Sequence, residues 1–273
     1  MVFALPYRLR VYLTILAVLL CAGIVGLMVV EHLSLLDATY FLIVTIATVG
    51  YGDIHPLTET GKILVILIIL TGVGCFVGVV ANAVEYMIDE NERKIRLEKL
   101  NMIIGIFFSE VGTRILKKMS THDNSVENIR SALIVSNNWS DAEFSHAKNV
   151  LKMHPCHLDS RSVPLEDLHG FLMHHKGFLL ALLENPQLIE HDSFTPLLQA
   201  LFHLTEELMA RDRLTGLPDT DYAHLSGDIN RVYQLLMIEW LTYMQYLNQN
   251  YPYLFSLAMR QNPFDTNASV IVT

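Results

Sequence analysis

Two long uncharged apolar runs constrain this fold more than any other feature of the sequence. Residues 11–30 and residues 63–84 contain no formal charge, and the second run is slightly the longer. A 20-residue helix rises about 30 Å, which is the thickness of the bilayer hydrocarbon. We expect two membrane-spanning helices. The first run is longer than the core of a secretory signal, about 7–15 residues, so we expect it to be retained.

The composition supports a membrane protein with a soluble part attached. Hydrophobic residues make up 52% of the 273 residues, and charged residues only 17%. The formal charge of −9 excludes a nucleic-acid binder, which needs a basic face. The three cysteines, Cys21, Cys75 and Cys156, are too few for a disulfide framework.

The distribution of basic residues predicts the orientation in the membrane. Arg8 and Arg10 precede the first run, and the link between the runs holds only Lys62. Four more basic residues follow the second run: Arg93, Lys94, Arg96 and Lys99. Because Lys and Arg near span ends stay on the cytoplasmic side, we expect a multi-pass protein of the cell membrane with both termini cytoplasmic.

The link between the runs, residues 31–62, is too apolar for a simple external loop. An acid near a helix N-terminus is favourable, so Asp37 predicts a short helix over residues 37–47. Such a helix reaches about halfway through the bilayer. The chain that returns from it must be buried in protein or line a water-filled path. Several copies around a common axis satisfy that condition.

The returning chain carries Thr48, Val49, Gly50, Tyr51 and Gly52. Glycines at alternate positions permit backbone angles that other residues resist, so successive carbonyl groups can point to one side. Four copies then form cages of oxygen atoms that replace the hydration shell of K⁺. We expect K⁺ to bind at residues 48–51, with the Val49 and Tyr51 side chains turned away and packed on the short helices.

The residues around this segment match a known signature. The matching residues are Thr45, Thr48, Val49, Gly50, Tyr51, Gly52, Asp53, Pro56 and Gly61. On these residues, the stretch 11–84 resembles the pore module of two-span prokaryotic potassium channels. The resemblance implies a homotetramer in the lipid bilayer that conducts K⁺ selectively, with K⁺ ions in the filter and no other cofactor. A weakly selective cation channel, and a membrane-anchored sensor whose helical domain carries the main function, are the alternatives.

One position departs from a pattern found in part of that family. Some members place a carboxylic acid where this chain has Val44, and that acid pairs with the Asp after the filter. Asp53 therefore lacks this partner. Two roles stay open for Asp53: an acidic ring at the outer mouth that concentrates cations, or a hydrogen-bonding brace behind Tyr51.

The second span is expected to hold the gate. The resemblance, anchored on Gly61, places a hinge at Gly72, although small residues in spans also serve as packing surfaces. A single helix face, expected to line the cavity and to constrict near its end, carries Val73, Phe76, Val80 and Val84. Glu85 follows at the inner end, either as a ring that attracts cations or as a solvated acid.

The remainder of the chain predicts a helical regulatory or assembly domain. We divide the chain into a pore module (1–88), a helical cytoplasmic domain (89–260), whose charged start at 89–99 continues the second span, and a flexible tail (261–273). Apolar stripes at helical spacing start at Leu165, Leu197 and Ile229. There is no glycine-rich nucleotide motif and no arginine ladder for voltage sensing, and no motif identifies a gating ligand.

Histidines are frequent in this domain. We do not expect a metal site at His154, Cys156 and His157, because their spacing matches no zinc pattern. A phosphohydrolase centre at His191 and Asp192 is not expected either, because this pair falls in a connection and its other ligands cannot be placed. We therefore expect no enzymatic centre. Protonation of the imidazoles near pH 6 is a hypothesis for acid sensitivity.

Overall fold

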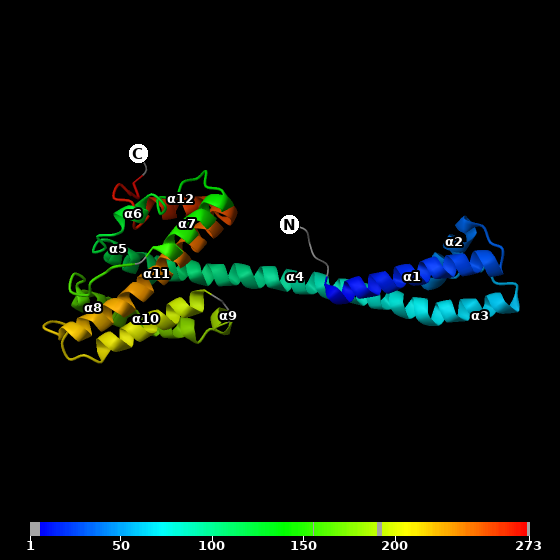
Figure 1. Ribbon diagram of the computed structural model, residues 1–273, viewed down its shortest axis with the longest axis horizontal. Helices are drawn as coiled ribbons and strands as arrows, with labels where there is room; N and C mark the ends of the chain where they lie inside the picture. Colours follow the sequence, from blue (N-terminus) through cyan, green and yellow to red (C-terminus); the bar gives the residue numbers. More distant parts are fainter. Residues whose placement is uncertain (1–5, 155, 190–192, 272–273) are drawn as a thin grey trace. The chain divides into compact units, whose positions relative to one another are not determined.

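The computed structural model describes residues 6–154, 156–189 and 193–271, and over these residues the chain is helical, with no strand (Figure 1). This confirms the predicted all-helical fold. The chain divides into two compact units, Met1–Ile95 and Arg96–Thr273. The boundary lies after Ile95 rather than after residue 88. It falls within one helix, since the charged segment 89–99 continues the second span without a break, as predicted.

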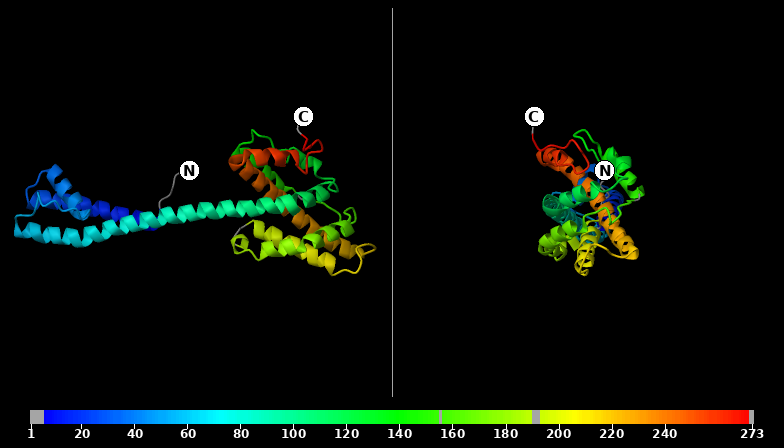
Figure 2. Two further views of the ribbon diagram at one scale, coloured as in Figure 1. Left: turned by 180° about the vertical axis from the view of Figure 1, so that it is seen from behind. Right: turned by 90° about the vertical axis from the view of Figure 1, so that its left-hand side faces the viewer.

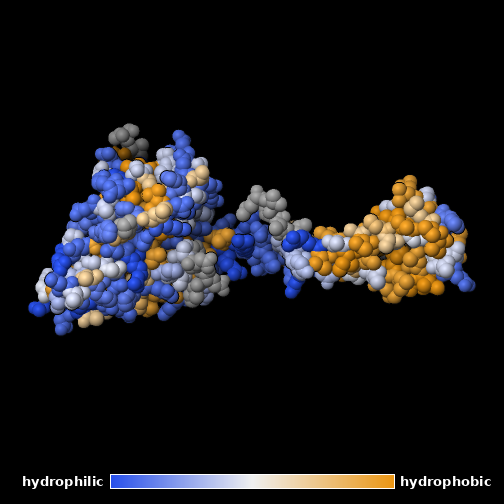
Figure 3. Space-filling model, viewed as in Figure 1, coloured by the Kyte–Doolittle hydropathy of each residue, from blue (hydrophilic) through white to orange (hydrophobic). Residues whose placement is uncertain are grey.

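The first unit contains the apolar segments. Its helices are α1 (Tyr7–Val30), α2 (Leu35–Ile46), α3 (Glu59–Ile68), the π-helical turn η1 (Ile69–Val73) and the first part of α4 (Gly74–Phe107). By length and composition, α1 and the continuous helix that starts at Glu59 are both able to cross a membrane. Apolar residues cover the visible surface of α1, α2 and α3 in Figure 3, as expected for helices that face lipid.

Short polar side chains determine where α2 and α3 begin. The Ser34 hydroxyl accepts a hydrogen bond from the backbone N–H of Asp37 at 3.2 Å, so α2 starts at Leu35. The predicted start at Asp37 is therefore wrong: Asp37 lies in the first turn, and Ser34 is the cap. Thr58 caps α3 in the same way by accepting from the N–H of Gly61 at 2.9 Å.

The second unit is a helical bundle with α11 (Asp219–Asn250) at its centre. Helix α11 packs against α5 (Thr113–Ser120), α7 (Asp141–Met153), α10 (Phe194–Met209) and α12 (Pro252–Arg260). Figure 2 shows these helices from two further directions, with α11 in orange and α10 in yellow. The remaining elements are α8 (Leu165–Leu183), which packs on α10, the π-helical turn η2 (Phe108–Gly112) and the single turns α6 (Glu127–Arg130) and α9 (Pro186–Ile189).

The three predicted apolar stripes form the core of this bundle. Leu165, Leu197 and Ile229, which start them, are buried, and most other members of each stripe are buried with them. The predicted flexible tail is corrected at its start. Phe264 is 1% exposed and packs edge-on against Trp240, while the Asn262 amide donates to the carbonyl of Leu133 at 2.9 Å. A single aromatic side chain buries enough apolar surface to hold this segment on the bundle.

Candidate ion pathway

The segment after α2 has an alternating backbone. Thr48, Gly50 and Gly52 have φ angles of +58°, +55° and +78°, whereas the intervening Val49 and Tyr51 do not have positive φ. A regular alternation of this kind turns successive peptide groups so that their carbonyl oxygens lie on one side. For Thr48 the left-handed conformation costs about 1–2 kcal/mol, a strain that proteins retain mainly at functional sites.

The backbone N–H groups of this segment are tied to the last turn of α2. The Val44 carbonyl accepts from the N–H of Val49 at 2.9 Å and from that of Gly50 at 3.3 Å, and the Thr45 carbonyl accepts from Thr48 at 3.0 Å. These backbone N–H groups therefore point towards the last turn of α2. The sequence suggested a role only for the side chain at position 44, whereas in the structure the main-chain oxygen of Val44 accepts the hydrogen bonds.

Asp53 has a partner that the sequence analysis missed. The side chain of Tyr40 lies close enough to the Asp53 carboxylate to interact with it. Tyr40 lies four residues before Val44, so the two positions share one face of α2. A tyrosine one turn earlier thus does what an acid at position 44 does in part of the family, and this favours the bracing role of Asp53. The helical spacing between Tyr40 and Val44 was the available signal.

Val49 and Tyr51 are not covered by their own chain. Their exposed fractions are 53% and 72%. The predicted packing of these side chains on short helices does not occur within one chain.

Gly72 lies inside the π-helical turn η1 and is buried. A Cβ atom at Gly72 would lie 2.9 Å from Cδ1 of Ile46, at the end of α2, so the missing side chain permits close packing between α2 and the second span. Packing, the alternative reading of this glycine, is thus directly visible. π-Helical turns are frequent at functional sites, which keeps the hinge as a hypothesis.

The predicted gate residues separate into two groups. Phe76 is half-buried and packs against the apolar core of the first unit, and Val73 is also half-buried. Val80, Val84 and Glu85 are exposed. Part of the Phe76 ring thus packs on the core of its own chain, and the expectation that all four apolar residues line one cavity stays a prediction.

Glu31 links the end of α1 to the start of α3, and the sequence analysis did not predict this contact. Its carboxylate accepts from the N–H groups of Leu57 and Thr58, both at 3.0 Å, and from the Thr58 hydroxyl at 2.6 Å. These bonds, the Thr58 hydroxyl first, hold the pKa of Glu31 below its usual range. A Cβ atom at Gly61 would lie 1.6 Å from the Glu31 oxygen, so only glycine leaves room for this carboxylate.

The histidines of the second unit do not build a metal centre in the described part of the chain. No group of three or more His, Cys, Asp or Glu residues there is arranged to hold a metal ion. The His154 ring instead shares a hydrogen bond with the Ser125 hydroxyl at 3.2 Å, and burial raises the pKa of Cys156 to about 12. His191 and Asp192 lie outside the described residues.

The α1, α2, filter and α3 arrangement defines a pore-loop ion channel domain in a membrane protein. In agreement, the sequence model of the ion channel family matches residues 14–89, which places the chain among channels rather than enzymes. The model of the C-terminal helical domain of the uncharacterized protein MJ1433 matches residues 96–260. The chain belongs to this family: it is 47% identical over 189 residues to MJ1433 of Methanocaldococcus jannaschii, covering 69% of this chain and 75% of that protein.

Named potassium channels are similar to the first unit. Potassium channel protein 1 of Methanocaldococcus jannaschii is 36% identical over 94 residues, which are 34% of this chain and 28% of that protein. Two-pore potassium channel 5 of Arabidopsis thaliana is 41% identical over 66 residues, 24% of this chain and 16% of that protein. The match thus spans less than a third of either channel. No solved structure matches the chain.

Proposed function

We propose that the protein is a potassium-selective channel formed by four identical chains around one axis in the cell membrane, with both termini cytoplasmic. The observation that carries this proposal is the alternation of positive φ at Thr48, Gly50 and Gly52. An ordinary glycine turn does not need three alternate left-handed residues, one of them a strained threonine. A column of carbonyl oxygens does.

The ions bind between the carbonyl oxygens of residues 48–51. Val49 and Gly50 donate their N–H groups to the Val44 carbonyl, so these backbone donors are satisfied inside the chain. Their oxygens are then free to replace the water around K⁺. The C-terminal end of α2 lies next to the filter, and its partial negative charge favours a cation there.

Four chains are needed to enclose this column. The filter of one chain leaves Val49 and Tyr51 exposed, and non-helical backbone at membrane depth must be buried or line water. Neighbouring copies of α2 cover these side chains in the tetramer. The assembly has a mass four times the 31.0 kDa of one chain.

The remaining polar and apolar residues act along the same axis. Asp53 braces the outer end of the filter through its contact with Tyr40, and Glu85 forms an acidic ring at the inner end, which raises the local concentration of cations. Gly72 is the hinge of the second span. Val80 and Val84 constrict the inner opening when the span is straight, because an apolar ring excludes water.

Replacing a filter glycine tests the proposal. Gly50→Ala adds a Cβ atom at a φ of +55°, which costs about 1–2 kcal/mol in each chain and is repeated four times around one pore. K⁺ efflux from proteoliposomes should fall by about tenfold or more. The matched control is Gly177→Ala on α8, where an added Cβ meets nothing within 4 Å, and its efflux should equal that of the wild type. Equal efflux from both variants would rule out a carbonyl filter at Gly50.

A further inference from the structure

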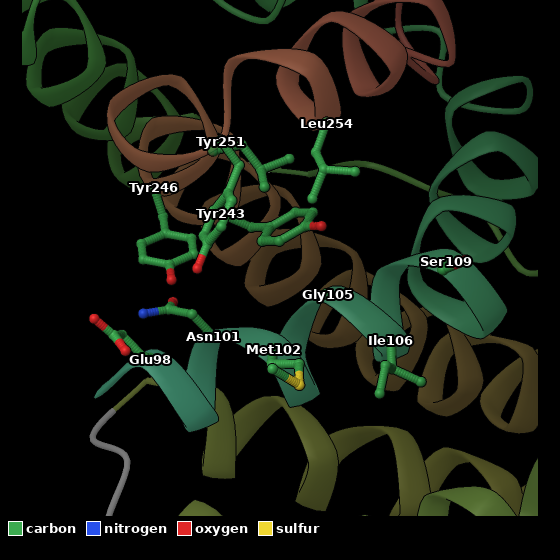
Figure 4. Close-up of a pocket in the computed structure, with 11 residues that line it drawn as sticks. Glu98, Asn101, Met102, Gly105, Ile106, Ser109, Tyr243, Tyr246, Tyr251 and Leu254 are labelled. Atoms are coloured by element: carbon green, nitrogen blue, oxygen red, sulfur yellow. The ribbon is translucent and has the colours of Figure 1, made fainter. Parts of the chain in front are cut away.

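A cavity of about 350 Å³ lies in the second unit between α4 and the end of α11 with α12 (Figure 4). This volume lies in the range of small-molecule sites. About half of the lining residues belong to α4 and the turn η2 that continues it, where they recur at helical spacing from Glu98 to Ser109. The others come from residues 243–247 and 251–254.

One end of the cavity is polar and acidic. Glu98, Asn101, Tyr246 and Tyr251 meet there, and Figure 4 shows the Tyr246 hydroxyl directed towards Asn101 and Glu98. The rings of Tyr246 and Tyr251 lie 5.7 Å apart, and their hydroxyls share a hydrogen bond. Among the residues that the structure describes, none forms an ion pair with Glu98, so the polar end carries a carboxylate that is available to a cation.

The other end of the cavity is apolar. Met102, Ile106, Leu254 and the ring of Tyr243 line it. Gly105 keeps the space open between these side chains, because a Cβ atom there would lie 3.0 Å from the Tyr243 hydroxyl oxygen. An apolar group of a ligand buried at this end gains about 25 cal/mol for each Å² removed from water.

We propose that this cavity binds an organic ammonium ion with an apolar body. The ammonium group sits at the polar end, where the Glu98 carboxylate and the faces of Tyr246 and Tyr251 attract a cation. Its N–H groups donate to the hydroxyl oxygens and to the Asn101 amide oxygen, and the apolar body fills the space beside Gly105. An anion is repelled by Glu98, and a purely apolar molecule leaves the polar end unpaired.

Such a ligand acts on a helix that the channel domain shares. Residues 74–95 of α4 belong to the first unit, and residues 98–107 line the cavity or lie between residues that do. A bound ligand therefore changes the conformations that α4 can adopt, and we expect it to alter channel opening. This consequence rests on the proposed function, whereas binding does not.

Calorimetric titration of the full-length protein in detergent, with saturating K⁺, tests the binding. The probes are 2-phenylethylammonium and its neutral analogue 2-phenylethanol. The ammonium probe should bind about tenfold more tightly than the alcohol, because a charge-assisted contact contributes over 1 kcal/mol. Glu98→Gln should weaken the ammonium probe by about tenfold and leave the alcohol unchanged. Glu92→Gln, an exposed acid on the same helix outside the cavity, is the matched control and should change neither affinity.

The proposal is overturned if the ammonium probe does not bind, or if it binds no better than the alcohol. It is also overturned if Glu98→Gln and Glu92→Gln behave alike, because the probe then binds elsewhere, for example in the pore. If a variant does not fold, the comparison of the two probes on the wild-type protein still overturns the proposal when it shows no preference for the ammonium ion. Since heat of binding is measured without any current, failure here is distinguishable from failure of the channel proposal.

Discussion

Asp53 and Tyr40 show how a single pair of side chains can support the proposed filter. Asp53 follows Gly52, and its carboxylate interacts with Tyr40 on α2. This contact links the end of the segment 48–52 to the helix beside it. Together with the two N–H groups held by the Val44 carbonyl, it anchors both ends of a strained segment.

Removing the Tyr40 hydroxyl should therefore make the filter less stable in its conducting form. Tyr40→Phe keeps the ring and deletes only the hydroxyl contact with Asp53. We predict that the mean open time of single channels falls by about threefold or more, the size of effect expected from one lost hydrogen bond. Tyr7→Phe makes the same change at an exposed position in α1 and should have no effect. Similar open times for the two variants would show that the contact does not support the filter.

These two residues could not be paired from the sequence alone. The signature residues from Thr48 to Asp53 are contiguous, so their chemistry is readable in one dimension. The Tyr40 contact depends on how the chain folds back along α2. The helical spacing from Val44 places Tyr40 on the same face of α2, but it does not show that residue 53 returns to that face. The role of Val44 was even harder to predict from the sequence, because it rests on a main-chain carbonyl group that every residue possesses.

At the scale of helices, Glu31 fixes the outer end of α1 to the start of α3. Its carboxylate accepts three hydrogen bonds from Leu57 and Thr58, and Gly61 leaves the space for it. An anion at a helix N-terminus also complements the helix dipole. The two spans are thus joined directly at their outer ends.

This joint predicts a pH dependence. The pKa of Glu31 is lowered from its ordinary value of 4.5 in the folded protein, so its contribution to stability is complete above that value. The contribution is lost as pH falls through the lowered pKa. At pH 6 the wild type should melt at a higher temperature than Glu31→Gln, and the difference should shrink as the pH falls below 4.5. A difference that stays constant over this range would contradict the account.

The positions of the main helices could be predicted from the sequence, but the start of α2 and the π-helical turn at Gly72 could not. Uncharged length was enough to find both spans, and apolar spacing found α8, α10 and α11. The predicted start of α2 is wrong because Asp37 is not the helix cap. Ser34, three residues earlier, fills that role. The π-helical turn at Gly72 left no mark on the apolar pattern, because one added residue in a turn barely shifts a short periodic run.

At the scale of the molecule, the two units rely on different environments. The first unit leaves large apolar side chains exposed, as expected for a unit that faces lipid, whereas the second buries most of its large apolar side chains around α11. The prediction of a flexible tail over residues 261–273 is wrong at Phe264, because it rested on the polar residues that surround this single aromatic side chain. Its partner Trp240 lies 24 positions earlier, a relationship that only the folded bundle reveals.

Core substitutions in the second unit should leave ion selectivity unchanged. Leu236 on α11 is fully buried, at 0% exposed, and Leu236→Ala should lower the free energy of unfolding of this unit by about 3 kcal/mol. Leu180→Ala, at a position 41% exposed, should change it little. Denaturant titration followed by circular dichroism gives the stability of both variants. Equal stability would contradict the assigned core, and an altered K⁺ to Na⁺ preference would show that the filter depends on it.

The reversal potential under opposed ion gradients tests the central claim most directly. The full-length protein is placed in a planar bilayer with K⁺ on one side and Na⁺ on the other, and the potential of zero current is measured. A filter of carbonyl oxygens at residues 48–51 predicts a reversal potential close to the K⁺ equilibrium value. A reversal potential near the Na⁺ limit would contradict it.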